Sequence, residues 1–179
     1  MLMRRILTPL AVVAAILFGS AGAASAVVVP PPNIPIFPVV LPIRTVIIAQ
    51  DGGPRFLDAH EIAERDFNVV TRPPQNNSTQ LWRLTNVSGN VYTIMQISSG
   101  RFLDAHEIAS LDFRVVTRPQ QNNNTQLWRL TDYGGAFFTV QQVSSGRYLD
   151  AYLSSAQDFQ AVTRPFNYSN SQVWRIVDA

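Results

Sequence analysis

Short segments of alternating hydrophobic and polar residues recur along the chain. Residues 45–50 (TVIIAQ), 91–96 (VYTIMQ) and 137–142 (FFTVQQ) are rich in β-branched and aromatic residues. Each is followed by a glycine-containing turn, with the sequence DGGP after the first segment and SSG after the other two. This combination predicts a β-strand that enters a tight hairpin turn.

Each of these segments begins a unit that contains three further predicted strands. The second strand has the sequence RFLDA or RYLDA, the third lies in the DF-x-VVTR segment, and the fourth has the sequence TQLWRLT or a close variant. Helical periodicity is almost absent. Residues 60–66 (HEIAERD) are the one helical candidate, and they predict a single turn at most.

The units repeat at a constant interval, because Trp82, Trp128 and Trp174 are 46 residues apart, as are Arg55 and its two counterparts. Such repetition determines the architecture. Three units of four strands are too few for a propeller, which needs about four or more blades. An open sheet would leave strand edges that require protection. The sequence therefore predicts an all-β domain over residues 44–179, a β-trefoil of three ~46-residue repeats.

The repeats are expected over residues 45–90, 91–136 and 137–179. One unit alone cannot bury its apolar face, whereas three together share a core. Large aromatic side chains dominate such a core. The expected core aromatics are Trp82, Trp128, Trp174, Phe67, Phe113 and Phe159.

The N-terminal residues 1–26 have the pattern of a secretory signal peptide. Arg4 and Arg5 precede a short apolar run at 6–18, and Ala24-Ser25-Ala26 forms a small-x-small cleavage site. The run is shorter than the ~20 residues of a spanning helix. We therefore expect a secreted protein with no integral membrane span after cleavage.

Residues 27–43 (VVVPPPNIPIFPVVLPI) form a proline-rich segment. Proline fixes φ and favours an extended, semi-rigid path. Two interpretations remain open: a linker or arm along the domain surface, or a docking segment for a protein partner.

Charge and composition exclude several functions. The chain has no cysteine and a formal charge of +2, and without Arg4 and Arg5 its 14 basic residues become 12, equal to its 12 acidic ones. Such a neutral chain lacks the basic footprint of a nucleic-acid binder. With two histidines and no cysteine, a closed zinc site is not expected. No phosphate loop, cofactor motif or catalytic constellation is recognisable, so no cofactor and no enzymatic activity are predicted.

The sequence Q-x-W closes every unit, after an upstream strand with Leu-Asp at a fixed distance. The three occurrences are Gln80-Leu81-Trp82, Gln126-Leu127-Trp128 and Gln172-Val173-Trp174. In these motifs residues 44–179 resemble the ricin B-chain-like lectins. The resemblance implies a β-trefoil and non-catalytic binding of galactose-type or related sugars in up to three shallow pockets. It also assigns the hydroxyl-accepting aspartate to Asp58, Asp104 and Asp150.

The sequence departs from the lectin pattern in two respects. Residues VVTR stand where the family usually has an aromatic platform, and Thr79, Thr125 or Ser171 precedes the Q-x-W glutamine in place of asparagine. The candidate sugar-binding residues are Asp58, His60, Asn76 and Asn77 in the first repeat, Asp104, His106, Asn122 and Asn123 in the second, and Asp150, Tyr152, Tyr168 and Asn170 in the third.

Other repeated polar residues have structural interpretations. The histidines are interpreted as ordinary exposed residues that could donate to a sugar. The aspartates before the DF phenylalanine are predicted to form turns. The T-R-P arginines are predicted to clamp Asp58 or Asp66 and their counterparts, and contact with an anionic sugar is the alternative. For Asp58, Asp104 and Asp150, a hydrogen bond from neighbouring backbone amides is an equal alternative to sugar binding.

We predict a secreted, non-catalytic, carbohydrate-binding protein. The alternative is a protein-interaction or inhibitor-type β-trefoil with degenerate sugar sites. The missing aromatic platform favours this alternative, and the proline-rich segment would then belong to the interface.

Overall fold

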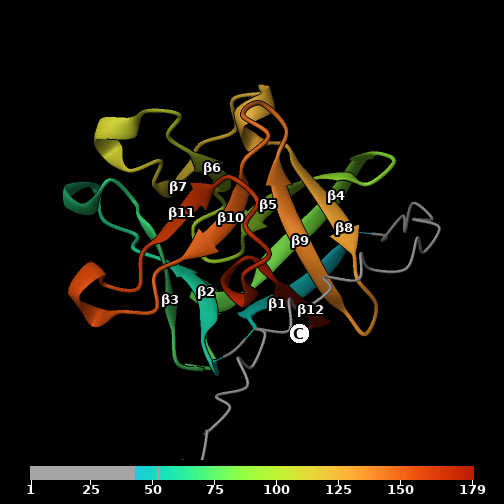
Figure 1. Ribbon diagram of the computed structural model, residues 1–179, viewed down its shortest axis with the longest axis horizontal. Helices are drawn as coiled ribbons and strands as arrows, with labels where there is room; N and C mark the ends of the chain where they lie inside the picture. The colour runs from blue at the N-terminus through green and yellow to red at the C-terminus, as the bar shows by residue number, and fades with distance from the viewer. Residues whose placement is uncertain (1–42, 52) are drawn as a thin grey trace, which may run out of the picture. The chain divides into compact units, whose positions relative to one another are not determined.

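A computed structural model describes residues 43–51 and 53–179 of the chain. This described part contains twelve strands and six short 3-10 helices, as the repeat pattern predicted (Figure 1). The predicted signal peptide and residues 27–42 of the proline-rich segment lie outside the described residues. Within those residues no helix has the length and apolarity needed to cross a bilayer.

Six strands close into a barrel. They are β1 (Arg44–Gln50), β4 (Trp82–Ser88), β5 (Val91–Gln96), β8 (Trp128–Asp132), β9 (Phe137–Gln142) and β12 (Trp174–Asp178). Strand β1 pairs antiparallel with β12 and β4, and the pairing continues through β5, β8 and β9 back to β12. The closed ring leaves its strands without free edges.

The other six strands form three hairpins, which lie together at the left in Figure 1. They are β2 (Phe56–Ala59) with β3 (Val69–Arg72), β6 (Phe102–Ala105) with β7 (Val115–Arg118), and β10 (Tyr148–Ala151) with β11 (Ala161–Arg164). This barrel of paired strands with a triplet of hairpins is the predicted β-trefoil.

The 3-10 helices recur twice in each repeat. They are η1 (Ala63–Arg65), η2 (Ser78–Gln80), η3 (Ala109–Leu111), η4 (Asn124–Gln126), η5 (Ser155–Gln157) and η6 (Asn170–Gln172). Helix η1 is the single turn expected in HEIAERD. Helix η2 contains the Thr-Gln of TQLWRLT, so the fourth strand begins only at Trp82.

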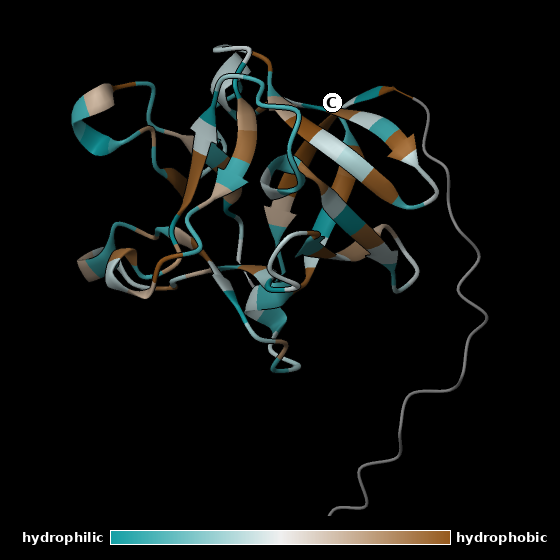
Figure 2. Ribbon diagram, turned by 90° about the horizontal axis from the view of Figure 1, so that it is seen from above, coloured by the Kyte–Doolittle hydropathy of each residue, from teal (hydrophilic) through white to brown (hydrophobic). Residues whose placement is uncertain are grey.

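Strand alternation places the predicted apolar side chains inside. In β1 the buried residues Val46, Ile48 and Gln50 are spaced by two. The hydrophobic bands that alternate along the barrel strands are visible in Figure 2. The largest fully buried apolar side chains are Trp82, Trp128, Trp174, Tyr92, Ile48, Leu57, Leu84, Ile94, Leu103 and Leu149.

The Q-x-W tryptophans tie the barrel to the hairpins. Each indole N–H donates a hydrogen bond of 3.0 Å to the carbonyl oxygen of the leucine in the LDA strand of its own repeat. The acceptors are Leu57, Leu103 and Leu149. A buried indole therefore contributes both apolar packing and a satisfied donor, which explains the motif at every repeat.

The Q-x-W glutamines are structural as well. The side chain of Gln80 accepts from the backbone N–H of Gln75 at 2.8 Å and donates to the carbonyl of Pro73 at 2.9 Å. Gln126 and Gln172 make the corresponding pair of bonds. Each glutamine thus fixes the loop that leads into its tryptophan.

The expected core position of Phe67, Phe113 and Phe159 is wrong. These side chains are only partly buried and lie outside the core cluster. Each follows an aspartate in the left-handed region and itself has φ of 50° to 52°. This conformation is unfavourable for a bulky residue, and it turns the phenylalanine out of its own repeat.

Each phenylalanine instead packs against the next repeat. The guanidinium of Arg101 lies 3.7 Å from the centre of the Phe67 ring, and Thr117 N–H donates to the Phe67 carbonyl at 3.0 Å. Arg101 also donates to the Thr117 carbonyl at 2.8 Å. The same contacts join Phe113 to Arg147 and Phe159 to Arg55, so the three hairpins are linked cyclically.

Replacement of a Q-x-W tryptophan by phenylalanine should destabilise the domain. Trp128→Phe leaves a small cavity and the buried Leu103 carbonyl without its indole donor, so the free energy of unfolding should fall by about 2–4 kcal/mol. Chemical denaturation monitored by circular dichroism measures this loss. Trp82→Phe and Trp174→Phe serve as matched replicates, and unchanged stability in all three would contradict the assigned role.

Candidate functional site

A shallow hollow of about 240 Å³ lies at the end of β2, beside the loop that leads into η2. Its lining is polar and includes both acidic and basic side chains. The lining residues are Asp58, Ala59, His60, Glu61, Arg72, Gln75, Asn77 and Thr79. The predicted site residues Asp58, His60 and Asn77 are therefore brought together.

The Asp58 carboxylate is buried, with 2% of the residue exposed. Its Oδ1 accepts from the backbone N–H of Ala59 at 2.7 Å, which confirms the backbone-bonding alternative. Its Oδ2 lies 3.8 Å from Nε of Arg72, which balances its charge. One oxygen therefore fixes the carboxylate, and the other faces the cation at the hollow.

A buried aspartate that accepts from the next backbone N–H recurs in the other two repeats. Asp104 and Asp150 are also buried, and each accepts from the following backbone N–H at 2.8 Å. Asp104 Oδ2 additionally accepts from Nε2 of the Q-x-W residue Gln126 at 3.2 Å. All three aspartates are thus preorganised as fixed hydrogen-bond acceptors.

The interpretation of His60 and His106 as ordinary exposed histidines is wrong. Their side chains are 12% and 15% exposed, and each approaches an aspartate of another repeat. Nε2 of His60 lies 3.1 Å from Asp158, and Nε2 of His106 lies 2.6 Å from Asp66. The histidines therefore connect repeats as well as bordering the site.

Tyr152 replaces the histidine in the third repeat and keeps the connection. Its hydroxyl donates to Asp112 Oδ2 at 2.6 Å, and Arg164 donates to Asp112 Oδ1 at 2.9 Å. The hydrogen bond to Asp112, together with burial, raises the pKa of the Tyr152 hydroxyl. The bond lies between repeats, since 40 residues separate Tyr152 from Asp112.

The turn-forming aspartates thus have two roles. Asp66, Asp112 and Asp158 end their 3-10 helices in the left-handed region, as predicted for turn formers. The T-R-P arginines clamp carboxylates, also as predicted, but Arg118 and Arg164 reach the aspartate of the preceding repeat. The sequence indicated these aspartates as candidate partners, but not that the bond would join two repeats.

The pKa of Asp66 reflects competing effects. Burial acts to raise the pKa, whereas the hydrogen bond from His106 and the charges of Arg118, His106 and Arg114 lower it, and the net shift is downward. Asp112 shows the same net lowering, with Tyr152 and Arg164 as its partners. The folded protein therefore favours the charged form of both carboxyls.

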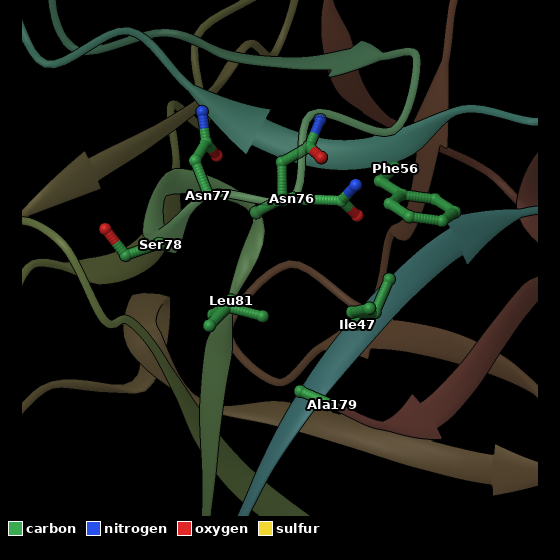
Figure 3. A pocket seen from close by; sticks show the side chains of 8 residues that line it. Ile47, Phe56, Asn76, Asn77, Ser78, Leu81 and Ala179 are labelled. Atoms are coloured by element: carbon green, nitrogen blue, oxygen red, sulfur yellow. The ribbon is translucent and has the colours of Figure 1, made fainter.

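The predicted asparagines divide between two hollows. Gln75 and Thr79 line the Asp58 hollow, whereas Asn76 and Ser78 line a second hollow of about 300 Å³. Figure 3 shows Asn76 and Asn77 at this second hollow, with Phe56 and Ile47 across from them. Asn77 borders both.

The second repeat contains an equivalent second hollow of about 360 Å³, lined by Asn122, Asn123 and Asn124. By the 46-residue correspondence, Tyr168 and Asn170 occupy this side of the third repeat, because they align with Asn122 and Asn124. Tyr168 accordingly stacks on Phe166, at 4.5 Å between ring centres. The expected grouping of Tyr168 and Asn170 with Asp150 stays a prediction, and Tyr168 belongs in addition to an aromatic cluster.

Among residues 43–51 and 53–179, no group of three or more histidine, cysteine or acidic residues is arranged to hold a metal ion.

A profile of the ricin-type beta-trefoil lectin domain-like family matches residues 78–162 and 124–179. These ranges together exceed half of the chain, and the chain belongs to this family. Comparison with curated protein sequences gives no match.

Solved structures share the fold. The designed threefold-symmetric protein ThreeFoil is 24% identical, with a TM-score of 0.67 over 75% of this chain and 99% of ThreeFoil. A Polyporus squamosus lectin bound to Neu5Aca2-6Galb1-4GlcNAc is 15% identical, with a TM-score of 0.66 over 77% of this chain and 50% of the lectin chain.

An exo-beta-1,3-galactanase from Clostridium thermocellum, 1,3Gal43A, is 19% identical, with a TM-score of 0.66. The match covers 76% of this chain but 30% of the galactanase chain. These likenesses establish the fold.

The carboxyl of Asp66 should make stability depend on acid pH. Because folding lowers its pKa, the unfolded chain binds the proton more readily, and this contribution is present above the unfolded pKa of about 4. It should disappear as pH falls from about 5 toward the folded pKa. Thermal melts between pH 7 and pH 3 should therefore show a shallower loss of stability in Asp66→Asn than in the unsubstituted protein.

Glu64→Gln provides a control, because it removes one nearby acidic group at an exposed position. A slope for Asp66→Asn that equals those of the unsubstituted protein and Glu64→Gln would show that the inter-repeat contact does not favour the charged carboxyl.

Proposed function

We propose that this chain is a secreted, non-catalytic protein that binds carbohydrate at the hollow of Asp58 and at the corresponding positions of Asp104 and Asp150. The observation that carries the proposal is the buried Asp58 carboxylate, held at the hollow by Ala59 N–H and charge-balanced by Arg72. The family to which the chain belongs supports the ligand class.

The chemistry of the Asp58 hollow suits a polyhydroxylated ligand. A fixed carboxylate accepts hydrogen bonds from hydroxyl groups, and charge-assisted bonds of this kind are the stronger ones. Arg72, Gln75 and Asn77 supply donors along the wall. Sugar hydroxyls both donate and accept, so they match this mixture of groups.

Arg72 also accounts for the missing aromatic platform. It belongs to the VVTR segment, where the family usually has the aromatic residue, and its planar guanidinium lines the hollow. A guanidinium can pack flat against a ring and donate in its plane. The site therefore offers a flat surface without an aromatic side chain in that segment.

Weak individual pockets gain strength from repetition. Three sites on one domain, one in each repeat, can engage a polymer or a glycan-coated surface together. The effective concentration of the second and third contacts is then set by the fixed spacing of the repeats. This mode of binding suits shallow hollows.

The proposal excludes a glycosidase role for Asp58 and Glu61. The Glu61 carboxylate accepts a hydrogen bond from the Ser98 hydroxyl of the next repeat. Asp58 already accepts from a backbone amide and faces Arg72. Both carboxylates thus have structural partners, and the galactanase likeness covers a minor part of that enzyme.

Conservative changes at the aspartates should weaken sugar binding selectively. Asp58→Asn, Asp104→Asn and Asp150→Asn keep the acceptor for the backbone amide but remove the charge, so affinity at the affected pocket should fall roughly ten- to a hundredfold. A glycan array followed by calorimetry on the best ligand measures this loss, with thermal melts to show that each variant is folded.

A blank array with well-folded protein would falsify the carbohydrate proposal. The protein-interaction alternative would then be tested by pull-down, with and without residues 27–43.

Secretion is tested by the mature N-terminus. Cleavage after the Ala24-Ser25-Ala26 site should release a chain that begins at Val27 into the culture medium, because small residues at these positions fit the signal peptidase. Intact-mass and N-terminal analysis of the medium check this outcome. Retention of residues 1–26 in a membrane fraction would contradict it, and Ala24→Leu with Ala26→Leu, which blocks cleavage, provides the control.

A further inference from the structure

The third repeat carries an aromatic cluster in the loop that precedes its Q-x-W motif and on strand β10. Tyr148 and Phe166 lie 4.8 Å apart between ring centres, and Phe166 and Tyr168 lie 4.5 Å apart. Tyr133 lies within electrostatic reach of Tyr148 and Tyr168, which together with burial raise the pKa of its hydroxyl.

All four rings occupy positions that correspond to residues of the second hollow in the other repeats. The correspondence follows from the 46-residue spacing. Tyr148 aligns with Phe56, Phe166 with Gln120, Tyr168 with Asn76 and Asn122, and Tyr133 with Val87 and Ala179. We call these four aromatic residues the tyrosine cluster.

The tyrosine cluster is poorly explained by stability. Tyr168 is 83% exposed and Tyr133 is 53% exposed, so both bury little apolar surface. Tyr168 also has φ of 59°, whereas its counterparts at this left-handed position are asparagines, which tolerate it better. An exposed and strained aromatic residue indicates a function.

The chemistry of the cluster favours a neutral pyranose ring. Three of its four members are tyrosines, which present an apolar face with a hydroxyl at the edge. The side chains that line the equivalent hollow of the second repeat are neutral, with threonine, asparagine and glutamine among them. A pyranose has the complementary pattern, because its C–H face is apolar and its hydroxyls lie at the rim.

The size of the equivalent hollows agrees with such a ligand. They enclose about 300 and 360 Å³, at the lower end of the range of small-ligand sites, ~300–1,000 Å³. The first and second repeats thus each form a second hollow, and Figure 3 shows the hollow of the first repeat.

We propose that the tyrosine cluster is a second saccharide-binding site, which stacks a pyranose ring of a neutral polysaccharide. It shares the ligand class of the proposed function but none of the aspartate pockets. A polysaccharide can therefore engage this site whether or not Asp150 binds sugar.

Affinity electrophoresis of the chain in gels with soluble β-1,3-glucan, xylan, galactan or galactomannan tests the proposal. Tyr168→Asn introduces the residue of the other two repeats and removes the ring, so the association constant should fall roughly tenfold. Tyr168→Phe keeps the ring and should retain most of the binding. The melting temperature of Tyr168→Asn should equal or exceed that of the unsubstituted protein.

The triple variant Asp58→Asn/Asp104→Asn/Asp150→Asn separates the two proposals. Retardation that is lost in Tyr168→Asn and kept in the triple variant supports the cluster and overturns the aspartate pockets. The reverse result overturns the cluster alone, and loss in both supports both sites. Absence of retardation of the unsubstituted protein in every gel overturns both proposals.

Discussion

The fold depends on the cyclic contact in which an arginine and a threonine of one repeat hold the phenylalanine of the preceding repeat. Phe67 illustrates it, with Arg101 over its ring and Thr117 N–H on its carbonyl. The contact places Phe67 in an unfavourable left-handed conformation, which only the neighbouring repeat compensates. Each phenylalanine has its arginine and threonine partners in the next repeat, so the three hairpins stabilise one another. The aspartate pockets and the second hollows lie beside these hairpins and take their geometry from this closure.

The sequence predicted the elements well because the relevant signals are local. Alternation in TVIIAQ and its counterparts indicates which side chains face inward, and the equal spacing of Trp82, Trp128 and Trp174 indicates three copies that share a core. Contacts between repeats carry no such local signal. Phe67 resembles a core residue in any one unit, and its left-handed backbone and its partner Arg101 follow only from the closed arrangement.

The candidate site was predicted in part for a similar reason. Asp58 follows from its strand, and Asn77 from its place before Q-x-W, and both line one hollow. Asn76 was grouped with them by proximity in sequence, yet it lines the second hollow, where its backbone has a left-handed φ of 52° that the sequence pattern does not indicate. The bond from His60 to Asp158 spans 98 residues, and periodicity within a repeat contains no information about such a pair.

The distribution of identical and different residues among the repeats separates scaffold from function. Positions that close the ring, such as Arg101 with its counterparts and the Q-x-W pair, remain identical, since a change in one copy would open a contact on which two repeats depend. Two other positions at the second hollow differ among the repeats: valine, tyrosine and alanine stand at one, and asparagine, asparagine and tyrosine at the other. Duplication alone leaves copies alike. The concentration of aromatic differences in the tyrosine cluster of the third repeat therefore requires a local cause, and a ligand that contacts this cluster supplies one.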